Sequence, residues 1–340
     1  MPNVGAAEGT VGPNTGKVVK TEGLTHYYGD LCAVNHLNLT VGRGEFFAFL
    51  GPNGAGKTTT IRLLSGLIRP KQGTAIIDGL DVVCSPLEVK ARIGVVPERS
   101  NLYAELSARD NLVFVAQLYG LPRSQCYERA DQLLVQFSLS EKADALFATL
   151  SGGMKRRLTI AAALVHRPTI LFLDEPTTGL DVQSARNLRT LLQTLHCEGI
   201  TIFLTTHLIQ EAERLAERIG ILVKGKLIAV DTPAALCARC ASEMALEVVV
   251  EPSSEALQTD LRQSAHVRSF SRVGDAVHLG VISYTNALQE IVTLAERHGA
   301  EIRAIRSITP SLEDAFVQMT GMDVAVLESN KPQSQGGQRA

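Results

Sequence analysis

The chain has 340 residues, of which 45% are hydrophobic, and a formal net charge of −2. It is long enough for a large domain and a smaller second one, and it lacks the dominant basic field of many nucleic-acid-binding proteins. No apolar run approaches the roughly 18–20 residues that cross a bilayer. Residues 1–18 contain no apolar segment typical of a secretory signal. We therefore expect a soluble, cytoplasmic protein with no nucleic-acid partner.

Six cysteines are scattered along the chain, and only Cys237 and Cys240 have the spacing of a pair. A metal site would need a second pair of ligands, and a redox motif would need to open a helix after a strand. Neither context is present, so we interpret the two as reduced thiols without a shared function.

Residues 19–240 alternate short apolar runs with longer helical patterns. Continuous apolar runs suit buried parallel strands that helices cover on both faces, and three such runs occur at Glu45–Leu50, Ile170–Asp174 and Thr201–Thr205. Strand signals fade within residues 86–168, where helical patterns dominate. The sequence therefore predicts an α/β core with a mostly helical subdomain at about residues 86–168.

Residues 243–322 have a different pattern, in the order β-α-β-β-α-β of a ferredoxin-like split βαβ unit. Gly274 and Asp275 form a turn pair between two of the strands, and Ser311 to Asp314 offers a capping box for a closing helix. We expect a small α+β domain here. The two ends, residues 1–18 and 323–340, lack apolar periodicity and are predicted to be disordered tails.

Residues 51–58 match the phosphate-binding pattern G-x-x-x-x-G-K-[ST], between the strand that ends at Leu50 and a predicted helix Lys57–Leu67. Glycines let backbone N–H groups approach phosphates, and the helix N-terminus favours the same negative charge. A glycine-rich turn without a ligand is the plainer alternative, and the strand and helix on either side disfavour it. We expect nucleotide binding by Gly51, Pro52, Asn53, Gly54, Ala55, Gly56, Lys57, Thr58 and Thr59.

Two acidic residues follow the apolar strand Ile170–Leu173. Asp174 is placed to hold Mg²⁺ together with the Thr58 hydroxyl, and Glu175 is placed to polarise a water molecule that attacks the γ-phosphate. Two acidic residues at a strand end are common in proteins. Here they lie downstream of a phosphate-binding loop, so we predict Glu175 and Lys57 as catalytic residues and Mg²⁺ as the cofactor of ATP.

Leu150-Ser151-Gly152-Gly153-Met154 resembles the signature of the ATP-binding-cassette (ABC) ATPases, about twenty residues before Asp174. The resemblance implies that this segment faces the ATP of a second subunit. The active unit would then be a head-to-tail dimer, expected here as a homodimer, with two nucleotides between the P-loops and the signatures.

Three further positions are similar to the family's pattern. Tyr28 resembles the aromatic residue that stacks on adenine, although Tyr27 is an immediate competitor and packing on the core is an alternative. Asp181 resembles the dimer-facing aspartate of the D-loop. His207 resembles the switch histidine that contacts the γ-phosphate, which makes it a third predicted catalytic residue.

Glu98 departs from the pattern, because the family usually carries a glutamine after the strand that here ends near Pro97. In the family this loop offers a neutral oxygen to Mg²⁺ and couples the ATPase to the membrane subunit. A carboxylate still provides an oxygen ligand, so Glu98 is predicted as a metal ligand beside Thr58 and Asp174. It adds negative charge near Glu175, and nucleotide binding without metal should be weaker.

The resemblance covers about residues 19–240, and residues 310–316 extend it to the ABC-2-type export ATPases of the daunorubicin-resistance and nodulation-factor types. Residues 243–322 are similar to the accessory domain that many of these carry. The resemblance implies an ATPase that powers export through integral membrane permease subunits, on the inner face of the cell membrane. A non-transport ABC ATPase acting in translation or DNA maintenance is the alternative. A small-molecule P-loop kinase does not account for the signature.

Overall fold

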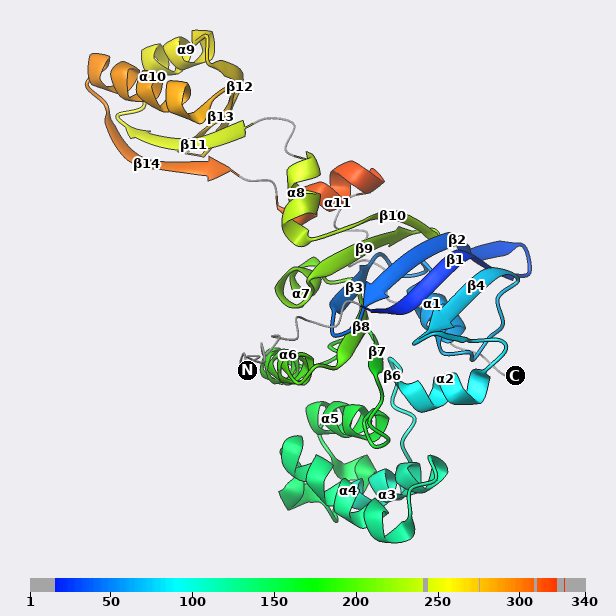
Figure 1. The fold of residues 1–340 in the computed structure, drawn as a ribbon. Coiled ribbons are helices and arrows are strands. Elements are labelled where there is room, and N and C mark those ends of the chain that lie inside the picture. Colours follow the sequence, from blue (N-terminus) through cyan, green and yellow to red (C-terminus); the bar gives the residue numbers. More distant parts are fainter. Residues whose placement is uncertain (1–15, 241–243, 275, 309–310, 323–326, 328–340) are drawn as a thin grey trace, which may run out of the picture. The chain divides into compact units, whose positions relative to one another are not determined.

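The computed structural model describes two compact units of the chain (Figure 1). The first contains the described residues up to Thr232 together with Leu327, and the second runs from Pro233 to Met322. The described residues are 16–240, 244–274, 276–308, 311–322 and 327. Most of the predicted tails, residues 1–15, 323–326 and 328–340, lie outside them.

The main sheet of the first unit has the strand order β10-β9-β3-β8-β7-β6. Its neighbours are parallel except β10, which pairs antiparallel with β9. All residues of β3 and β7 are buried, as the continuous apolar runs predicted. The strands are β3 (Phe46–Leu50), β6 (Ile93–Val96), β7 (Ile170–Asp174), β8 (Thr201–Thr206), β9 (Arg218–Val223) and β10 (Lys226–Asp231).

Among the helices that connect these strands, bounds were predicted from the sequence only for the one after the phosphate-binding loop, and that helix begins at Lys57 as predicted. The helix after the phosphate-binding loop stops at Leu64 rather than Leu67, since Gly66 follows with a left-handed φ of 67°. The connecting helices are α1 (Lys57–Leu64), α2 (Pro86–Arg92), α6 (Val182–Cys197) and α7 (Ile209–Leu215).

The first unit also contains an antiparallel sheet of order β2-β1-β4-β5, which was not predicted from the sequence. Its first strands are interrupted by register shifts, for example between Thr21 and Leu24, which break the period-2 pattern that marks a strand. Residues 17 and 18, predicted as tail, belong to this sheet. The strands are β1 (Lys17–Tyr28), β2 (Leu31–Gly42), β4 (Gln72–Ile77) and β5 (Leu80–Asp81).

The helical part of the first unit follows β6, which lies inside the predicted range 86–168 but belongs to the main sheet. The Ser107 hydroxyl caps the first of its helices by accepting from the N–H of Asp110. The elements are α3 (Ala108–Leu118), α4 (Arg123–Gln136), α5 (Gly152–Ala163) and the short 3₁₀ helices η1 (Ser140–Lys142) and η2 (Phe147–Thr149).

The second unit has an antiparallel sheet of order β12-β13-β11-β14, and the side chains of α9 and α10 pack with it into one apolar cluster. Its elements follow the predicted order β-α-β-β-α-β. They are β11 (Met244–Glu251), α9 (Glu255–Gln263), β12 (Val267–Val273), β13 (Ala276–Val281), α10 (Tyr284–Arg297) and β14 (Glu301–Ile308). Asp275 of the predicted turn lies outside the described residues.

Two helices flank this sheet in the sequence, α8 (Pro233–Cys240) and α11 (Leu312–Thr320), and they pack against each other. The predicted capping box of α11 is present, with Ser311 and Asp314 each bonding the other's backbone N–H. Because α8 pairs with α11, the first residue of the second unit is Pro233, earlier than the sequence pattern suggested. The Cys240 side chain lies outside the described part, so the interpretation of the two thiols stays a prediction.

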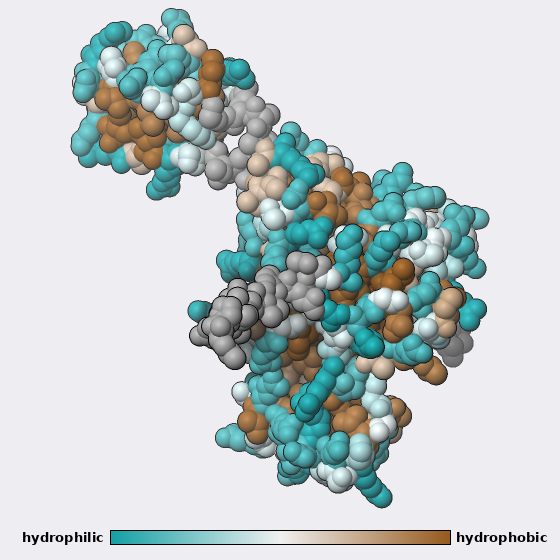
Figure 2. Space-filling model, in the orientation of Figure 1, coloured by the Kyte–Doolittle hydropathy of each residue, from teal (hydrophilic) through white to brown (hydrophobic). Residues whose placement is uncertain are grey.

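Hydrophilic residues cover much of the face of the molecule seen in Figure 2, with apolar patches between them. Within the described residues, none of the helices combines the length and the apolar character that crossing a membrane requires.

Candidate active site

The P-loop lies between β3 and α1, and two of its glycines are required by the packing of the loop itself. A Cβ on Gly51 would lie 2.2 Å from the carbonyl oxygen of Leu222. A Cβ on Gly56 would lie 2.2 Å from that of Ala33, and the φ of Gly56 is 105°. Any side chain at either position would displace backbone. The predicted need for glycine therefore has a structural cause in addition to phosphate approach.

The N-terminus of α1 is suited to bind an anion. Its N-cap residue, Gly56, provides no side-chain oxygen for the first backbone N–H groups, and the first turn contains no acidic residue. Those N–H groups and the positive end of the helix dipole are left for a phosphate. Thr58 follows in the same turn and lines a cavity beside it.

The side chains of Lys57, Glu175 and His207 lie in contact beside the carboxyl ends of β7 and β8, with Lys57 and Glu175 buried and His207 partly buried. The Lys57 ammonium lies 3.0 Å from Oε1 of Glu175 and donates to the carbonyl oxygen of Gly51 at 2.6 Å. Nδ1 of His207 lies 2.7 Å from Oε2 of Glu175. The structure thus brings the three predicted catalytic side chains into direct contact.

Glu175 is held in an unusual backbone conformation for a residue with a side chain, with a φ of +46°. Its N–H donates to the carbonyl oxygen of Thr205 at 3.0 Å, which fixes it against β8. Burial raises the pKa of the Glu175 carboxyl, but the hydrogen bond with His207 and the charge of Lys57 outweigh burial, so its pKa is lowered overall. Glu175 is therefore ionised at neutral pH.

Asp174 ends β7 and is fixed by a hydrogen bond of 2.6 Å from the Thr205 hydroxyl to its Oδ1. A cavity of about 260 Å³ is lined by all three predicted metal ligands, Thr58, Glu98 and Asp174. Hydroxyl and carboxylate oxygens are the donors that Mg²⁺ prefers. Among the described residues no group of three His, Cys, Asp or Glu side chains could hold a metal alone. These donors fit a cation that phosphate oxygens also bind.

The signature begins α5, and Ser151 and Gly152 are exposed there. The Ser151 hydroxyl caps the helix by accepting from the N–H of Met154 at 3.3 Å. A Cβ on Gly153 would lie 2.6 Å from Oγ of Ser184, so glycine is needed for the approach of α6. Leu150, at the other end of the signature, is buried.

Asp181 caps α6, where its Oδ1 accepts from the N–H of Ser184 at 2.8 Å. Hydrogen bonds from the hydroxyl and the backbone of Ser184 lower the pKa of the Asp181 carboxyl. Asp181 and Gly153 therefore both lie against Ser184, which joins the predicted signature to the start of α6.

Tyr28 lies at the end of β1 with its ring 43% exposed, and it packs edge-on against His26. It is not packed in the core, and it pairs with Leu31 in the hairpin that leads to Ala33, the neighbour of Gly56. Tyr27 is 38% exposed, so exposure alone does not choose between the two rings.

Three buried polar residues around this site were missed from the sequence: Thr205, Arg156 and Glu211. Thr205 forms hydrogen bonds with Asp174 and with the backbone N–H of Glu175. The sequence feature that could have indicated this role is a polar residue near the end of an apolar strand. Glu211 is 1% exposed, and no hydrogen-bond partner for either carboxylate oxygen lies in the described part of the chain. Burial raises its pKa. Its position on α7 gave no signal.

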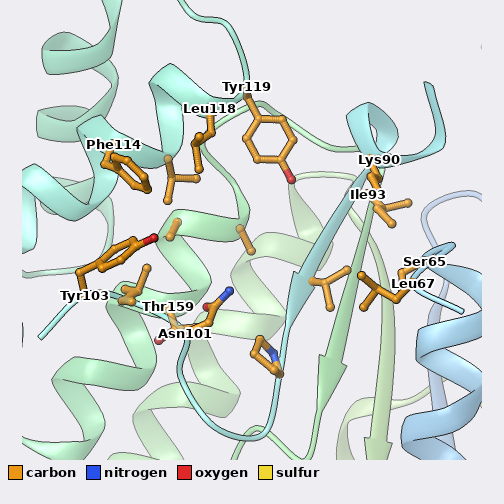
Figure 3. A pocket seen from close by; sticks show the side chains of 16 residues that line it. Ser65, Leu67, Lys90, Ile93, Asn101, Tyr103, Phe114, Leu118, Tyr119 and Thr159 are labelled. Carbon is orange, nitrogen blue, oxygen red and sulfur yellow. The ribbon is translucent and has the colours of Figure 1, made fainter. Parts of the chain in front are cut away.

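An apolar groove of about 500 Å³ lies between β6 and the helices α3 and α5 (Figure 3). Tyr103, Phe114 and Leu118 line it on the helical side, and Ile93 lines it on the side of the sheet. Pro97, next to Glu98, lines both this groove and the cavity of Asp174. The groove and the predicted metal site therefore share a wall.

Comparison with known proteins gives consistent results for the cassette. Residues 34–178 match the family model described as ABC transporter. The chain is 33% identical to the linearmycin resistance ATP-binding protein LnrL of Bacillus subtilis (strain 168), over 89% of this chain and 98% of the relative. It is 39% identical to the Nod factor export ATP-binding protein I of Paraburkholderia xenovorans (strain LB400), over 87% and 95%.

Solved structures are similar over the first part of the chain. The structure of cbiO1 from Clostridium perfringens, part of the ABC transporter complex cbiONQ, has 30% identity and a TM-score of 0.60, covering 65% of this chain and 91% of that one. A dimeric post-hydrolysis structure of the cassette MJ0796 bound to ADP and Pi has 28% identity and a TM-score of 0.57, covering 63% and 98%.

Proposed function

The chain belongs to the ABC transporter family and is an ATP-binding, ATP-hydrolysing subunit, and on this premise we propose that it powers an ABC-2-type exporter. The observation that carries the hydrolytic part is the contact of Lys57, Glu175 and His207 beside the P-loop. Export is supported by relatives named for drug resistance and for Nod factor export.

In the proposed mechanism Lys57 exchanges its partner when ATP binds. The Lys57 ammonium lies 3.0 Å from Oε1 of Glu175 in the structure. A γ-phosphate bound at the P-loop carries more negative charge than this carboxylate and would take its place as the partner of Lys57. The departure of Lys57 leaves Oε1 free to accept a proton from an attacking water. His207 keeps Oε2 in place and contacts the γ-phosphate, so it couples the presence of that phosphate to the orientation of Glu175.

Thr58, Asp174 and Glu98 are proposed to hold the Mg²⁺ of MgATP, since all three line one cavity. When bound, the cation supplies neutralisation of charge on the phosphates. Thr205 supports the site from within the sheet by fixing Asp174 through its hydroxyl.

A second copy is proposed to complete each site. Ser151 and Gly152 are exposed at the start of α5, and a helix N-terminus is suited to the phosphates of ATP bound by a partner. Asp181 would face the same partner from the start of α6, and Tyr28 would stack on adenine in its own subunit. The dimeric form of the similar cassette with ADP and Pi supports this arrangement.

The apolar groove is proposed to take a short helical segment of a membrane permease, which would place the chain on the inner face of the cell membrane. Large apolar side chains remain exposed along it, with Leu67 61% and Leu118 69% exposed. Burying such side chains favours association. Because Pro97 borders both the groove and the cavity of Asp174, an occupant could act on the Glu98 loop.

A non-transport role in translation or DNA maintenance is not favoured. The relatives described above are named for resistance and export, and the net charge of −2 offers no general attraction for nucleic acid.

The proposal is tested by co-expressing the chain with the membrane protein encoded beside its gene and purifying the pair in detergent. Leu118→Asp should abolish co-purification and the stimulation of ATP hydrolysis by the membrane protein, because it places a charge in the groove. Val135→Asp is the matched control, since Val135 is also 69% exposed but lies on α4 outside the groove. Equal co-purification of both variants would exclude the groove as the docking site.

A further inference from the structure

Arg156 is buried at the junction of three segments of the active site, although it was not among the predicted site residues. It lies on α5, just after the signature, and is 7% exposed. Its Nε donates to the carbonyl oxygen of Pro176 at 2.8 Å and its Nη2 to that of Asp174 at 2.9 Å. Its Nη1 donates to the carbonyl oxygens of Pro97 and Glu98, the latter at 3.2 Å.

These four carbonyl groups belong to the two segments whose relative position sets the catalytic geometry. Pro97 and Glu98 begin the loop after β6, which borders both the groove and the predicted metal cavity. Asp174 and Pro176 lie immediately on either side of Glu175. One planar guanidinium therefore fixes the backbone around Glu175 to the Glu98 loop and to α5.

The charge of Arg156 is compatible with this buried position. Burial lowers the pKa of Arg156 to about 10, against the favourable influence of Asp174, Glu98, Glu211 and Glu175. It stays protonated at neutral pH and keeps all its donors. A lysine has a single point of attachment and cannot reproduce the fork that reaches both segments.

We propose that Arg156 is a positioning residue that transmits movement of the signature helix and of the Glu98 loop to Glu175 of the same subunit. The inference rests on the proposed function, in which Ser151 at the start of α5 contacts the ATP of the partner. Engagement of that ATP would then align Glu175 at the other site through Arg156. Replacing Arg156 would therefore misalign Glu175, whereas the P-loop would keep its affinity for ATP.

A purely structural role for Arg156 can be separated from this one, because the chain contains a comparable arginine elsewhere. Arg129 on α4 donates to the carbonyl oxygens of Leu164 and Val165 at 2.8 and 3.1 Å, and it is half-buried. It contacts none of the catalytic segments among the described residues. Arg129→Gln therefore reproduces the loss of an arginine that bonds backbone carbonyl oxygens, without touching Glu175.

The experiment compares full-length wild type, Arg156→Gln, Arg156→Lys and Arg129→Gln. ATP hydrolysis is measured against ATP concentration, nucleotide affinity with a fluorescent ATP analogue, and folding by thermal melting. We expect kcat of Arg156→Gln to fall at least about tenfold while affinity changes less than about threefold. Arg156→Lys should fall between it and wild type. Arg129→Gln should keep kcat within about twofold even if it melts at a lower temperature.

Two results would overturn the inference. One is a kcat within about twofold of wild type for Arg156→Gln, or for Arg156→Lys where the glutamine variant does not fold. The other is an equal loss of kcat in Arg129→Gln. A wild-type chain without any ATP hydrolysis would instead refute the proposed function and can be told apart from both.

Discussion

The carboxylate of Glu175 is subject to opposing influences from groups within 3.0 Å of its oxygens and from its own burial. Burial disfavours its charge, whereas His207 and Lys57 favour it and prevail. A lowered pKa in the folded chain means that this ionised group stabilises the fold at pH values above its ordinary pKa. That contribution is lost as the pH falls through the lowered value. At neutral pH Glu175 is therefore ionised and contributes to the stability of the fold.

Replacing Glu175 with Gln should abolish most ATP hydrolysis, because an amide cannot accept a proton from water. We expect kcat to fall by about 100-fold or more, within the range of general-base contributions. ATP binding should persist, since the P-loop is unchanged. Glu213→Gln, an exposed glutamate on α7, is the control and should hydrolyse ATP as wild type does. A Glu175→Gln chain with the wild-type rate would show that another group activates the water.

Replacing Glu98 with Gln should strengthen ATP binding when metal is removed with EDTA. Glu98 lines the cavity of Asp174, so its charge repels phosphates unless a cation screens it. A repulsion of about 1 kcal/mol in an exposed setting corresponds to an affinity gain of about fivefold. Titration of the two chains with ATP in EDTA measures this gain. Glu105→Gln, exposed in the same loop nearer to α3, should leave the affinity unchanged, and an equal gain there would mean that only net charge matters.

At the residue scale, sequence reasoning predicted the charged side chains of the candidate site but missed the residues that hold them in place. Lys57, Glu175 and His207 stand in patterns with fixed spacing, and the structure places them in contact. Thr205 and Arg156 act through hydrogen bonds to backbone carbonyls and to neighbouring carboxylates. Such bonds depend on which segments the fold brings together, and spacing along the chain does not reveal them.

At the scale of elements, the most predictable strands were those buried on both faces. β3 is entirely apolar, and β7 is apolar up to its last residue, Asp174. The bounds of both strands agree with the predicted bounds to within a residue. The strands β1 and β2 were missed because their register shifts interrupt the alternation of apolar and polar residues. Helix starts were predicted from caps such as Ser311, whereas the end of α1 depends on the conformation of Gly66.

The packing of α7 against the site contains a buried carboxylate whose ionisation should oppose folding. Burial raises the pKa of Glu211, and the charge of Glu175 raises it further, whereas the nearby Thr206 and Thr177 side chains and the charge of Arg189 act in the opposite direction. The folded chain thus holds the Glu211 proton more tightly than the unfolded chain does. Its stabilising contribution is complete below the ordinary pKa of 4.5 and is lost as the pH rises through the raised value.

Glu211→Gln should therefore melt at a higher temperature than wild type at pH 8, and the difference should shrink as the pH falls towards 5. The amide keeps the shape of the protonated carboxyl and has no charge to bury. Thermal melting of both chains from pH 5 to 8 measures the effect. Glu213→Gln controls for loss of a charge on the same helix. A melting difference that does not change with pH would contradict the raised pKa of Glu211.

At the scale of the whole molecule, the order of elements in the second unit followed from the sequence, but the antiparallel sheet of the first unit and the pairings between distant elements did not. The strand order β12-β13-β11-β14 is compatible with the β-α-β-β-α-β pattern. The contact of α8 with α11 joins segments on either side of that whole pattern, and no local signal marks it. The change of sequence pattern near Cys240 indicated two units. The boundary itself lies after Thr232, and only the packing of α8 against α11 reveals that position.

The proposed active form is a dimer of this chain, in which the signature of one copy binds the phosphates of the ATP held by the other. In this arrangement neither the P-loop nor the signature alone completes a site. ATP should therefore join two copies wherever hydrolysis cannot separate them again.

The most direct test is the mass of the Glu175→Gln chain in solution, measured by light scattering after gel filtration. We predict one copy without nucleotide or with ADP, and two copies with MgATP. Gly153→Asp in the same background should remain a single copy with ATP, because the added side chain and its charge disrupt the signature. A Glu175→Gln chain that binds ATP and stays a single copy would contradict the composite site between two subunits.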